Sequence, residues 1–351
     1  MSLRTLDQTI SNLPKSFCRT LGTPAYTGSS SEGIALAVEC MKRHMSNEGW
    51  QFMLGLEHAD YPLYGFNIHR TGNLTDVEKI LEDSSPGVVV VQDKREWGEG
   101  ISRTFGEPRA RFTNLQALKD RSDIFTLTVV RDAHHNPEYH AQSAEELGVN
   151  AWVVFYNPRI VHHLAPYTRL EHIVRTYNSI DKECIPKFLR GNLRKGCLLS
   201  GAVSSVYPLR QALRSYSSHL PETSVLRHPG YHANGSNTPS FLHQLNQYKV
   251  AVCTSSIYGY ALRKIIEATA CGCLVITDLP RDEVLPGIDD NLLRVSPSQS
   301  LTSFPEMLRS LYASYNEERQ RHYAEEAKKF YDYRVLGSKL AKDIEDLRCT
   351  Y

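Results

Sequence analysis

Short apolar runs alternate with helical segments along most of the chain, and this alternation limits the possible folds more than any other feature. The runs at 86–93 (PGVVVVQD), 124–132 (IFTLTVVRD) and 151–158 (AWVVFYNP) end in polar residues. Continuous apolar runs are typical of parallel strands that are buried on both faces of a sheet. The pattern therefore predicts a doubly wound parallel α/β sheet in the first half of the chain.

Three further segments of the first half have their own patterns. Residues 32–45 (EGIALAVECMKRHM) have helical periodicity and predict a helix capped by Ser31. Residues 49–56 (GWQFMLGL) predict a strand, and residues 75–83 (TDVEKILED) predict a helix with Thr75 as its N-cap.

The same alternation starts again near residue 190. Gly272 stands where the C′ glycine of a helix belongs, directly before the apolar run CLVIT. The second half has predicted strands at 196–201, 248–256, 273–277 and 292–296, helices at 207–220, 240–247 and before Gly272, and mostly helical sequence over 302–349.

We expect two Rossmann-like domains that face each other across a cleft, because the α/β pattern occurs twice. The N-terminal domain would comprise residues 1–180 and the C-terminal domain residues 181–328, with a hinge near 176–190. Residues 329–351 would form a C-terminal helix that packs back toward the N-terminal domain. Ligands of such folds bind at the carboxyl ends of the strands, so we expect the site in the cleft.

The composition is that of an ordinary globular protein. The 351 residues carry a formal net charge of +1 and are 41% hydrophobic, which gives no electrostatic argument for a nucleic-acid or membrane partner. No apolar run approaches the ~20 residues that span a bilayer, and the N-terminus lacks the apolar core of a signal peptide, so we expect a cytoplasmic protein. The 8 cysteines form no C-x-x-C pair, which disfavours a zinc or redox site.

Polar or glycine residues follow almost every predicted strand. Strand ends are commonly polar, but in an open parallel sheet this edge is also where ligands bind. The residues concerned are Gln92, Asp93, Arg131, Asp132, Tyr156, Asn157, Ser200, Gly201, Thr254, Ser255, Ser256, Thr277 and Asp278.

The loop after the first strand of the second half has the parts of a phosphate-binding site. Ser200 and Gly201 end the strand, and a helix begins at Pro208, a preferred first helical residue. Free N–H groups at a helix N-terminus favour an anion. The segment matches neither the dinucleotide nor the Walker glycine pattern, so those two ligand classes lack their motif.

The helix before Gly272 carries charges that have two interpretations. Lys264 and Glu267 are three residues apart and therefore lie on one face of the helix. As an exposed ion pair they would contribute under ~1 kcal/mol to stability. Alternatively, Lys264 binds a diphosphate and Glu267 accepts hydrogen bonds from a ribose, as a nucleotide-sugar donor requires. The sequence has no D-x-D motif, so we expect no metal ion. We also expect no cofactor, because the nucleotide-sugar would be a co-substrate.

Two segments of the second half resemble a known family. LRKIIEATACGCLVITD (262–278) resembles the donor-binding helix of GT-B glycosyltransferases, especially of the CgeB/YkvP-like group. LLSGAVSSVYPLRQAL (198–213) is similar to the first strand, loop and Arg-bearing helix of that group's C-terminal domain. The resemblance covers mainly residues 195–300. The segment departs from the E-x7-E form of retaining enzymes, because no second Glu stands at that spacing from Glu267, so the stereochemistry stays open.

The resemblance implies the residues of a donor site. Glu267 would bind the ribose and Lys264 the diphosphate of a nucleotide-sugar, most simply a UDP-sugar. The donor-binding residues that it implies are Ser200, Gly201, Arg210, Tyr260, Arg263, Lys264 and Glu267.

The first half would then bind the acceptor. His134 follows a predicted strand end and is the first candidate for the general base, with His135 and Asp132 beside it. The loop at 92–100 would also contribute Asp93, Arg95 and Trp97 to the acceptor side, with Trp97 as a sugar or base platform.

The sequence favours a metal-independent, hexosyltransferase-like glycosyltransferase that moves a sugar from a nucleoside-diphosphate-sugar to a hydroxyl of a small molecule or glycan. One alternative is a glucosyltransferase that acts on hydroxymethyl-pyrimidines of DNA, for which residues 187–196 (KFLRGNLRKG) are the one basic candidate. A second alternative is a non-catalytic binding protein that keeps the fold. Donor sugar, nucleotide base, acceptor and oligomeric state stay open.

Overall fold

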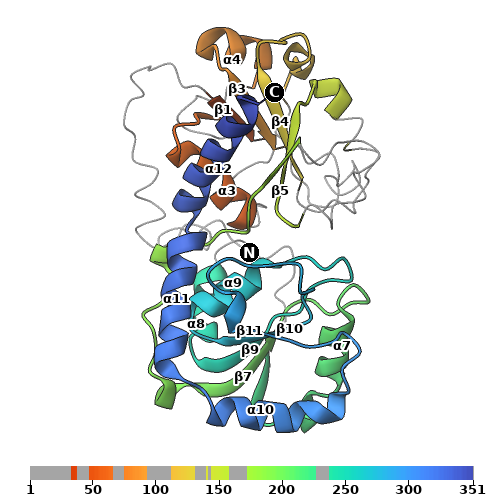
Figure 1. Cartoon of the computed structure of the whole chain (residues 1–351), viewed down its shortest axis with the longest axis vertical. Coiled ribbons are helices and arrows are strands. Elements are labelled where there is room, and N and C mark those ends of the chain that lie inside the picture. Colours follow the sequence, from red (N-terminus) through yellow and green to blue (C-terminus); the bar gives the residue numbers. More distant parts are fainter. Residues whose placement is uncertain are drawn as a thin grey trace, which may run out of the picture.

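The chain forms two α/β domains, each built on one parallel sheet (Figure 1). The structure, a computed structural model, describes residues 33–37, 47–65, 75–92, 112–130, 140, 144–157, 172–226 and 237–350. Within these residues the N-terminal sheet has the strand order β2-β1-β3-β4-β5-β6 and the C-terminal sheet β11-β10-β9-β7-β8. The paired strands of both sheets run parallel. The predicted fold of two Rossmann-like domains is therefore confirmed.

Helices cover both faces of the N-terminal sheet. Ile34 of β1 shares a hydrophobic cluster with Ile80 of α4, whereas its neighbour Ala35 shares another with Met53 of α3. Successive side chains of a strand point to opposite faces, so α3 and α4 lie on opposite sides of the sheet. The elements are β1 (Gly33–Ala37), α3 (Asn47–His58), β2 (Leu63–Gly65), α4 (Val77–Ser84), β3 (Val88–Gln92), β4 (Phe125–Val130), β5 (Ala151–Val154) and β6 (Ile173–Arg175), with a 3₁₀ turn at Leu115–Leu118.

Three local predictions for the first half are wrong. Residues 33–37, predicted as part of a helix, form β1, which is buried at every position because it lies inside the sheet. Residues 49–56, predicted as a strand, lie in α3, whose residues Phe52, Met53 and Leu56 are buried at the spacing of one helix face. The N-cap of α4 is Asp76 instead of Thr75, because its carboxylate accepts from the Lys79 N–H.

The C-terminal sheet is likewise covered on both faces. Leu242 of α8, Ile265 of α9 and Ala327 of α11 share one cluster, and Leu209 of α7 shares another with Phe304 of α10. The predicted strands and helices of this half are confirmed, and the partly exposed edge strand β8 is an addition. The elements are β7 (Lys195–Ser200), α7 (Pro208–Ser215), β8 (Thr223–Leu226), α8 (Asn237–Leu245), β9 (Tyr248–Val252), α9 (Arg263–Ala270), β10 (Leu274–Thr277), β11 (Leu292–Arg294), α10 (Phe304–Ala313), α11 (Glu317–Tyr331) and α12 (Tyr333–Arg348).

Two segments connect the domains and run side by side. Ile180, on the segment after β6, donates its N–H to the Tyr331 carbonyl at 2.8 Å and accepts from the Tyr333 N–H at 2.9 Å. Between these two tyrosines, Asp332 is fully buried and caps α12 by accepting from the Arg334 N–H. The joint between α11 and α12 is therefore hydrogen-bonded to the other connection, so the two connections are coupled.

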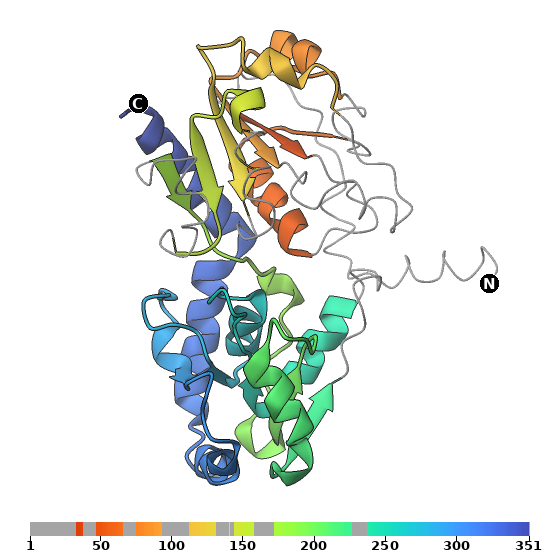
Figure 2. The ribbon, with the colours of Figure 1, turned by 90° about the vertical axis from the view of Figure 1, so that its right-hand side faces the viewer.

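Helix α12 packs against the N-terminal domain, while α11 lies along the C-terminal domain (Figures 1 and 2). At the crossing of α12 with α3, a Cβ atom on Gly337 would overlap the Gly55 carbonyl, and one on Gly55 would lie 2.5 Å from the Tyr333 oxygen. The two helix backbones therefore touch. Leu340 and Ile344 of α12 complete the same hydrophobic cluster. Within the described residues no helix has the length and apolar character needed to cross a membrane.

The glycine crossing predicts the effect of Gly337→Ala. Helix propensity alone would stabilise this variant by about 1 kcal/mol. Because the added methyl group meets backbone, we expect the overlap to prevail and the free energy of unfolding to fall by about 1–3 kcal/mol. Ser338→Ala, at the exposed next residue, is the control and should stay within about 0.5 kcal/mol of the wild type. Urea unfolding measures both, and a more stable Gly337→Ala would contradict the close crossing.

Candidate functional site

Two cationic side chains meet at the glycine that follows β7. Gly201 has a φ of +115°, a backbone conformation that favours glycine. A Cβ atom here would lie 2.6 Å from Arg210 Nη1 and 2.8 Å from Lys264 Nζ. Arg210 comes from α7 and Lys264 from α9, so the fold brings together four of the predicted donor residues: Ser200, Gly201, Arg210 and Lys264. We call these four residues the cradle.

Arg210 is held in place by backbone carbonyls. Its side chain is 2% exposed, and it donates to the Ala202 oxygen at 2.9 Å and to the Thr254 oxygen at 3.1 Å. Its guanidinium lies 4.1 Å from the centroid of the Tyr207 ring. Arg210 therefore joins the loop after β7 to the loop after β9, and its positive charge has a fixed position beside Gly201.

Asp278 connects a third loop, the one after β10, to the loops around the cradle. It follows β10, and its carboxylate accepts from the Ser255 N–H in the loop after β9. Burial raises the pKa of Asp278 above its ordinary value, while the Ser255 N–H and the positive charge of Arg210 oppose that shift. The carboxyl ends of β7, β9 and β10 are thus connected around the cradle.

Helix α9 places its charged residues in different surroundings. Glu267 is buried, and its Oε1 lies 3.0 Å from Nε of Arg263 in an ion pair whose side chains are 6% and 7% exposed. Lys264 is partly exposed, with Nζ 5.7 Å from the centroid of the Phe241 ring. The pair Arg263–Glu267 is therefore part of the domain interior, whereas the side chain of Lys264 extends to Gly201. The ribose role of Glu267 stays a prediction.

Tyr260 lies at the contact between the domains. Its ring stacks on that of Tyr156, with centroids 4.0 Å apart and an interplanar angle of 2°. Tyr258 stacks on it from the same loop at 5.7 Å. Tyr156 follows β5 and Tyr260 follows β9, so the carboxyl ends of the two sheets face each other at this point.

The predicted acceptor residues lie outside the described residues. These are Asp132, His134 and His135, together with Asp93, Arg95 and Trp97. The general base therefore stays a prediction. Within the described part of the chain, no group of three or more His, Cys, Asp or Glu side chains is arranged to hold a metal ion.

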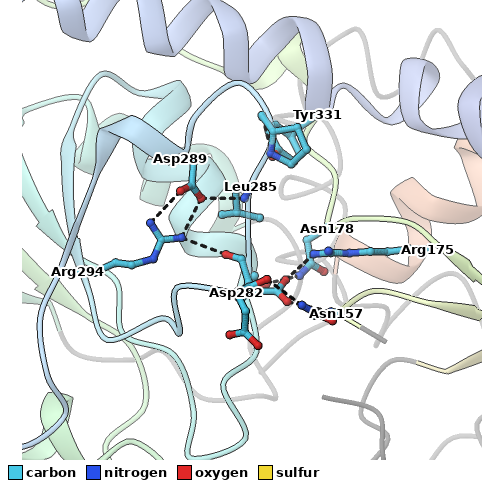
Figure 3. Close-up of polar contacts among 11 residues, drawn as sticks. Asn157, Arg175, Asn178, Asp282, Leu285, Asp289, Arg294 and Tyr331 are labelled. Atoms are coloured by element: carbon cyan, nitrogen blue, oxygen red, sulfur yellow. Dashed lines mark hydrogen bonds and ion pairs between the residues drawn. The ribbon is translucent and has the colours of Figure 1, made fainter. Parts of the chain in front are cut away.

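A second contact between the domains centres on Glu283, a residue that the sequence analysis does not identify. Glu283 is fully buried, and its Oε1 accepts from Nη2 of Arg175 at 2.6 Å while its Oε2 accepts from the Asn157 N–H at 2.9 Å. The Asn157 side chain donates to the Asp282 carbonyl at 2.8 Å (Figure 3). Arg175 and Asn157 belong to the N-terminal domain, so this network, the junction, joins the domains.

The loop that carries Glu283 is braced within its own domain. Arg294 of β11 donates to both carboxylate oxygens of Asp289, at 3.0 and 2.8 Å, and to the Glu283 carbonyl at 3.0 Å. Asp289 also accepts from the Leu285 N–H at 2.9 Å (Figure 3). From α11, the Tyr331 hydroxyl donates to the Pro286 carbonyl at 3.0 Å. The loop is therefore a fixed support for Glu283.

Comparison with known proteins finds solved structures of similar fold. No family model matches the sequence, and no curated protein matches it. Among solved structures, a glycosyltransferase from Rickettsia africae is similar with a TM-score of 0.55 and 10% identity, over 92% of this chain and 100% of that one.

Two further solved structures have a similar fold. HepE from Anabaena, solved with UDP-glucose, gives a TM-score of 0.52 and 12% identity over 90% of this chain and 99% of that one. Sucrose-phosphate synthase from Thermosynechococcus elongatus gives 0.50 and 10% over 78% and 77%. At these identities the likeness concerns the fold, which is that of GT-B glycosyltransferases.

The burial of Glu283 predicts a pH dependence of stability. Desolvation raises the pKa of this carboxyl from 4.5 to about 7, although the charge of Arg175 and the Asn157 N–H oppose the shift. The folded chain thus holds the proton more tightly than the unfolded chain, so this stabilisation is complete below about pH 4.5 and is lost as the pH rises through about 7. Within the described residues, the titratable groups that interact with Glu283 include Arg175, Tyr177, Asp282, Arg294 and Tyr331.

We therefore expect Glu283→Gln to have a flatter stability profile than the wild type between about pH 5 and pH 8. The difference should be on the order of 1–3 kcal/mol, because Gln has no proton to release on this range. Urea unfolding at four pH values measures it. Glu306→Gln, at a side chain that is 90% exposed, should follow the wild-type profile. Parallel profiles for the wild type and Glu283→Gln would contradict the raised pKa.

Proposed function

We propose that the chain is a glycosyltransferase that transfers a sugar from a nucleoside-diphosphate-sugar to a hydroxyl acceptor. The observation that carries this proposal is the convergence on Gly201 of Arg210, from the first turn of α7, and Lys264, from α9. A diphosphate leaving group gains negative charge as the sugar bond breaks, and fixed cations and backbone N–H groups stabilise that charge. The cradle would thus supply with side chains what other transferases obtain from a metal ion.

The fold supports the same chemistry by analogy. HepE, which shares the fold, is solved with UDP-glucose, and in another structure with UDP and glucose. We therefore propose a UDP-sugar as the donor and a hexose as the transferred group. The assignment to the CgeB/YkvP-like group rests on the sequence resemblance of residues 195–300 and is part of the proposal.

Each residue of the site has a proposed role. Lys264 neutralises the diphosphate, and Arg210 fixes the Gly201 loop while adding its positive charge. Glu267 accepts hydrogen bonds from the ribose, which would require the carboxylate to be shared between the ligand and Arg263. The N-terminal domain binds the acceptor, a small molecule or glycan, and His134 is the first candidate for the base that removes the hydroxyl proton.

The hypothesis of DNA as the acceptor keeps only part of its basic cluster at the surface. In residues 187–196, Lys187, Arg190 and Lys195 are exposed, whereas Arg194 is 6% exposed. The Arg194 guanidinium donates to the backbone oxygens of Leu189, Tyr248 and Cys271 at 2.8–3.0 Å. It is committed to the domain interior and does not add to a phosphate-binding surface. DNA as the acceptor and a non-catalytic nucleotide-binding protein both stay alternatives, and hydrolysis of UDP-glucose to glucose and UDP distinguishes the second of them from an enzyme.

Nucleotide binding tests the cradle, and Gly201→Ala is the sharpest variant. UDP at ~100 times its dissociation constant should stabilise the wild type by about 2.7 kcal/mol in a thermal-shift panel with GDP and the nucleotide-sugars. The Cβ of Gly201→Ala would displace both cations, so we expect at least tenfold weaker UDP binding by calorimetry. Gly287→Ala, also at a glycine of positive φ but with no Cβ contact under 3.7 Å, is the control for backbone strain. Equal UDP affinity in Gly201→Ala and wild type would contradict the phosphate site.

Substitutions on α9 separate the roles of its two charged residues. Glu267→Ala removes acceptors of ribose hydroxyls, so UDP affinity should fall about tenfold to a hundredfold, equivalent to roughly 1–3 kcal/mol. Lys264→Ala should mainly slow UDP release from UDP-glucose, because charge on the leaving diphosphate grows toward the transition state. Circular dichroism checks folding, since Glu267 is also the ion-pair partner of Arg263. Unchanged UDP affinity in folded Glu267→Ala would rule out the ribose role.

A further inference from the structure

The loops that surround the cradle also hold the N-terminal domain. The loop after β9 accepts a hydrogen bond from Arg210 through Thr254 and stacks Tyr260 on Tyr156. The loop after β10 begins at Asp278, beside the cradle, and five residues later presents Glu283 to the Asn157 N–H. Tyr156 and Asn157, two consecutive residues that follow β5, therefore each contact a loop of the proposed donor site. Tyr156 stacks on Tyr260, and the Asn157 N–H bonds to Glu283.

The hydrogen bonds of Glu283 exclude a role as catalytic base. Its side chain is fully buried, and both carboxylate oxygens accept from groups of the other domain, Arg175 Nη2 and the Asn157 N–H. Arg175 is itself held in place, with its guanidinium 4.5 Å from the centroid of the Tyr177 ring. Tyr177 in turn packs edge-on against Tyr331, with centroids 5.8 Å apart. Glu283, on one side of the junction, and its partner Arg175, on the other, are therefore both held in fixed positions.

Stability alone does not account for this arrangement. Desolvation raises the pKa of Glu283 to about 7 despite the nearby Arg175, which means that burial disfavours the charged form more than the ion pair favours it. Buried ion pairs of this kind contribute little net stability, and in some proteins their role is to select one geometry. The two carboxylate oxygens of Glu283 lie on one braced loop and accept from two donors of the other domain, the Asn157 N–H after β5 and Arg175 at the end of β6. Such a paired contact is suited to selecting one geometry of the two domains.

We propose that Glu283 is a positioning residue of the transfer reaction, which fixes the N-terminal domain relative to the cradle through Arg175 and the Asn157 N–H. The inference rests on the proposed function, because the group that it positions is the acceptor side of that reaction. An acceptor hydroxyl held by one domain must approach a sugar held by the other, and a misplacement of about 1 Å lowers the rate by roughly a hundredfold. The proposed nucleotide-binding residues all belong to the C-terminal domain, so we expect loss of the contacts of Glu283 with the N-terminal domain to change UDP affinity little.

The test compares two variants of Glu283 with one control. Glu283→Ala removes both acceptors, whereas Glu283→Gln keeps one. We expect UDP affinity within twofold of wild type in both variants. With water in place of the acceptor hydroxyl, UDP-glucose gives glucose and UDP, and kcat for this hydrolysis should be at least tenfold lower in Ala, with Gln in between, because the proposed base belongs to the N-terminal domain. Asp123→Asn breaks an exposed ion pair with Arg121 in the same N-terminal domain and should leave both quantities unchanged. Equal losses of kcat and UDP affinity, or an unchanged kcat, would overturn the positioning role.

Amide hydrogen exchange supplies a measurement that needs no activity. In Glu283→Ala the Asn157 N–H loses its acceptor, so the peptide containing Asn157 should exchange at least tenfold faster, while α10, remote from the junction, keeps its protection. Unchanged exchange at Asn157 would overturn the proposal even if kcat falls. If the wild type binds no nucleotide, the proposed function fails and the role in transfer fails with it. The exchange result then still decides whether Glu283 holds the domains together.

Discussion

The contact between α12 and α3 is the constraint on which the arrangement of the two domains depends. The last helix of the chain leaves the C-terminal domain and packs on the N-terminal one, at a crossing where Gly55 and Gly337 let the backbones touch. The other connection is hydrogen-bonded to the start of this helix through Ile180. With two coupled connections on one side, the carboxyl ends of the sheets face each other, and Tyr156 meets Tyr260 there.

The proposed donor site and the junction are parts of one structure. Loops after β7, β9 and β10 are joined around Gly201 by Arg210 and by the bond from Ser255 to Asp278. The loop after β10 then continues to Glu283, whose carboxylate is bonded to the other domain. One short, braced loop therefore connects the cradle, whose cations would bind the leaving group, with Glu283, whose carboxylate bonds to the opposite domain. The proposed binding of the diphosphate and the placement of the N-terminal domain both depend on the backbone of this loop.

Sequence patterns predicted the elements that satisfy their own local preferences. The unit of α9 and β10 was predicted because a glycine ends the helix and a fully apolar run follows; Gly272 has a φ of +81°, as a C′ glycine does. Residues 33–37 are predicted as helix but form a strand, and residues 49–56 are predicted as strand but lie in a helix. Both predictions fail because apolar runs of five to eight residues fit the period of a strand and that of a helix. The four cradle residues are donor-site candidates from the loop pattern after β7, the charge spacing on α9 and the family resemblance, and the fold brings Arg210 and Lys264 together at Gly201. Glu283 had no local signal, because its partners lie 108 and 126 positions away.

A crystal structure of the chain with UDP tests the central claim most directly. The account predicts that the diphosphate lies against the Gly201 backbone, within hydrogen-bonding distance of Lys264 Nζ, and that the ribose lies toward Glu267. The side chain of Arg210 should keep its bonds to the Ala202 and Thr254 carbonyls, because these bonds hold the Gly201 loop in place. UDP bound elsewhere on the chain, with the cradle unoccupied, would contradict the account.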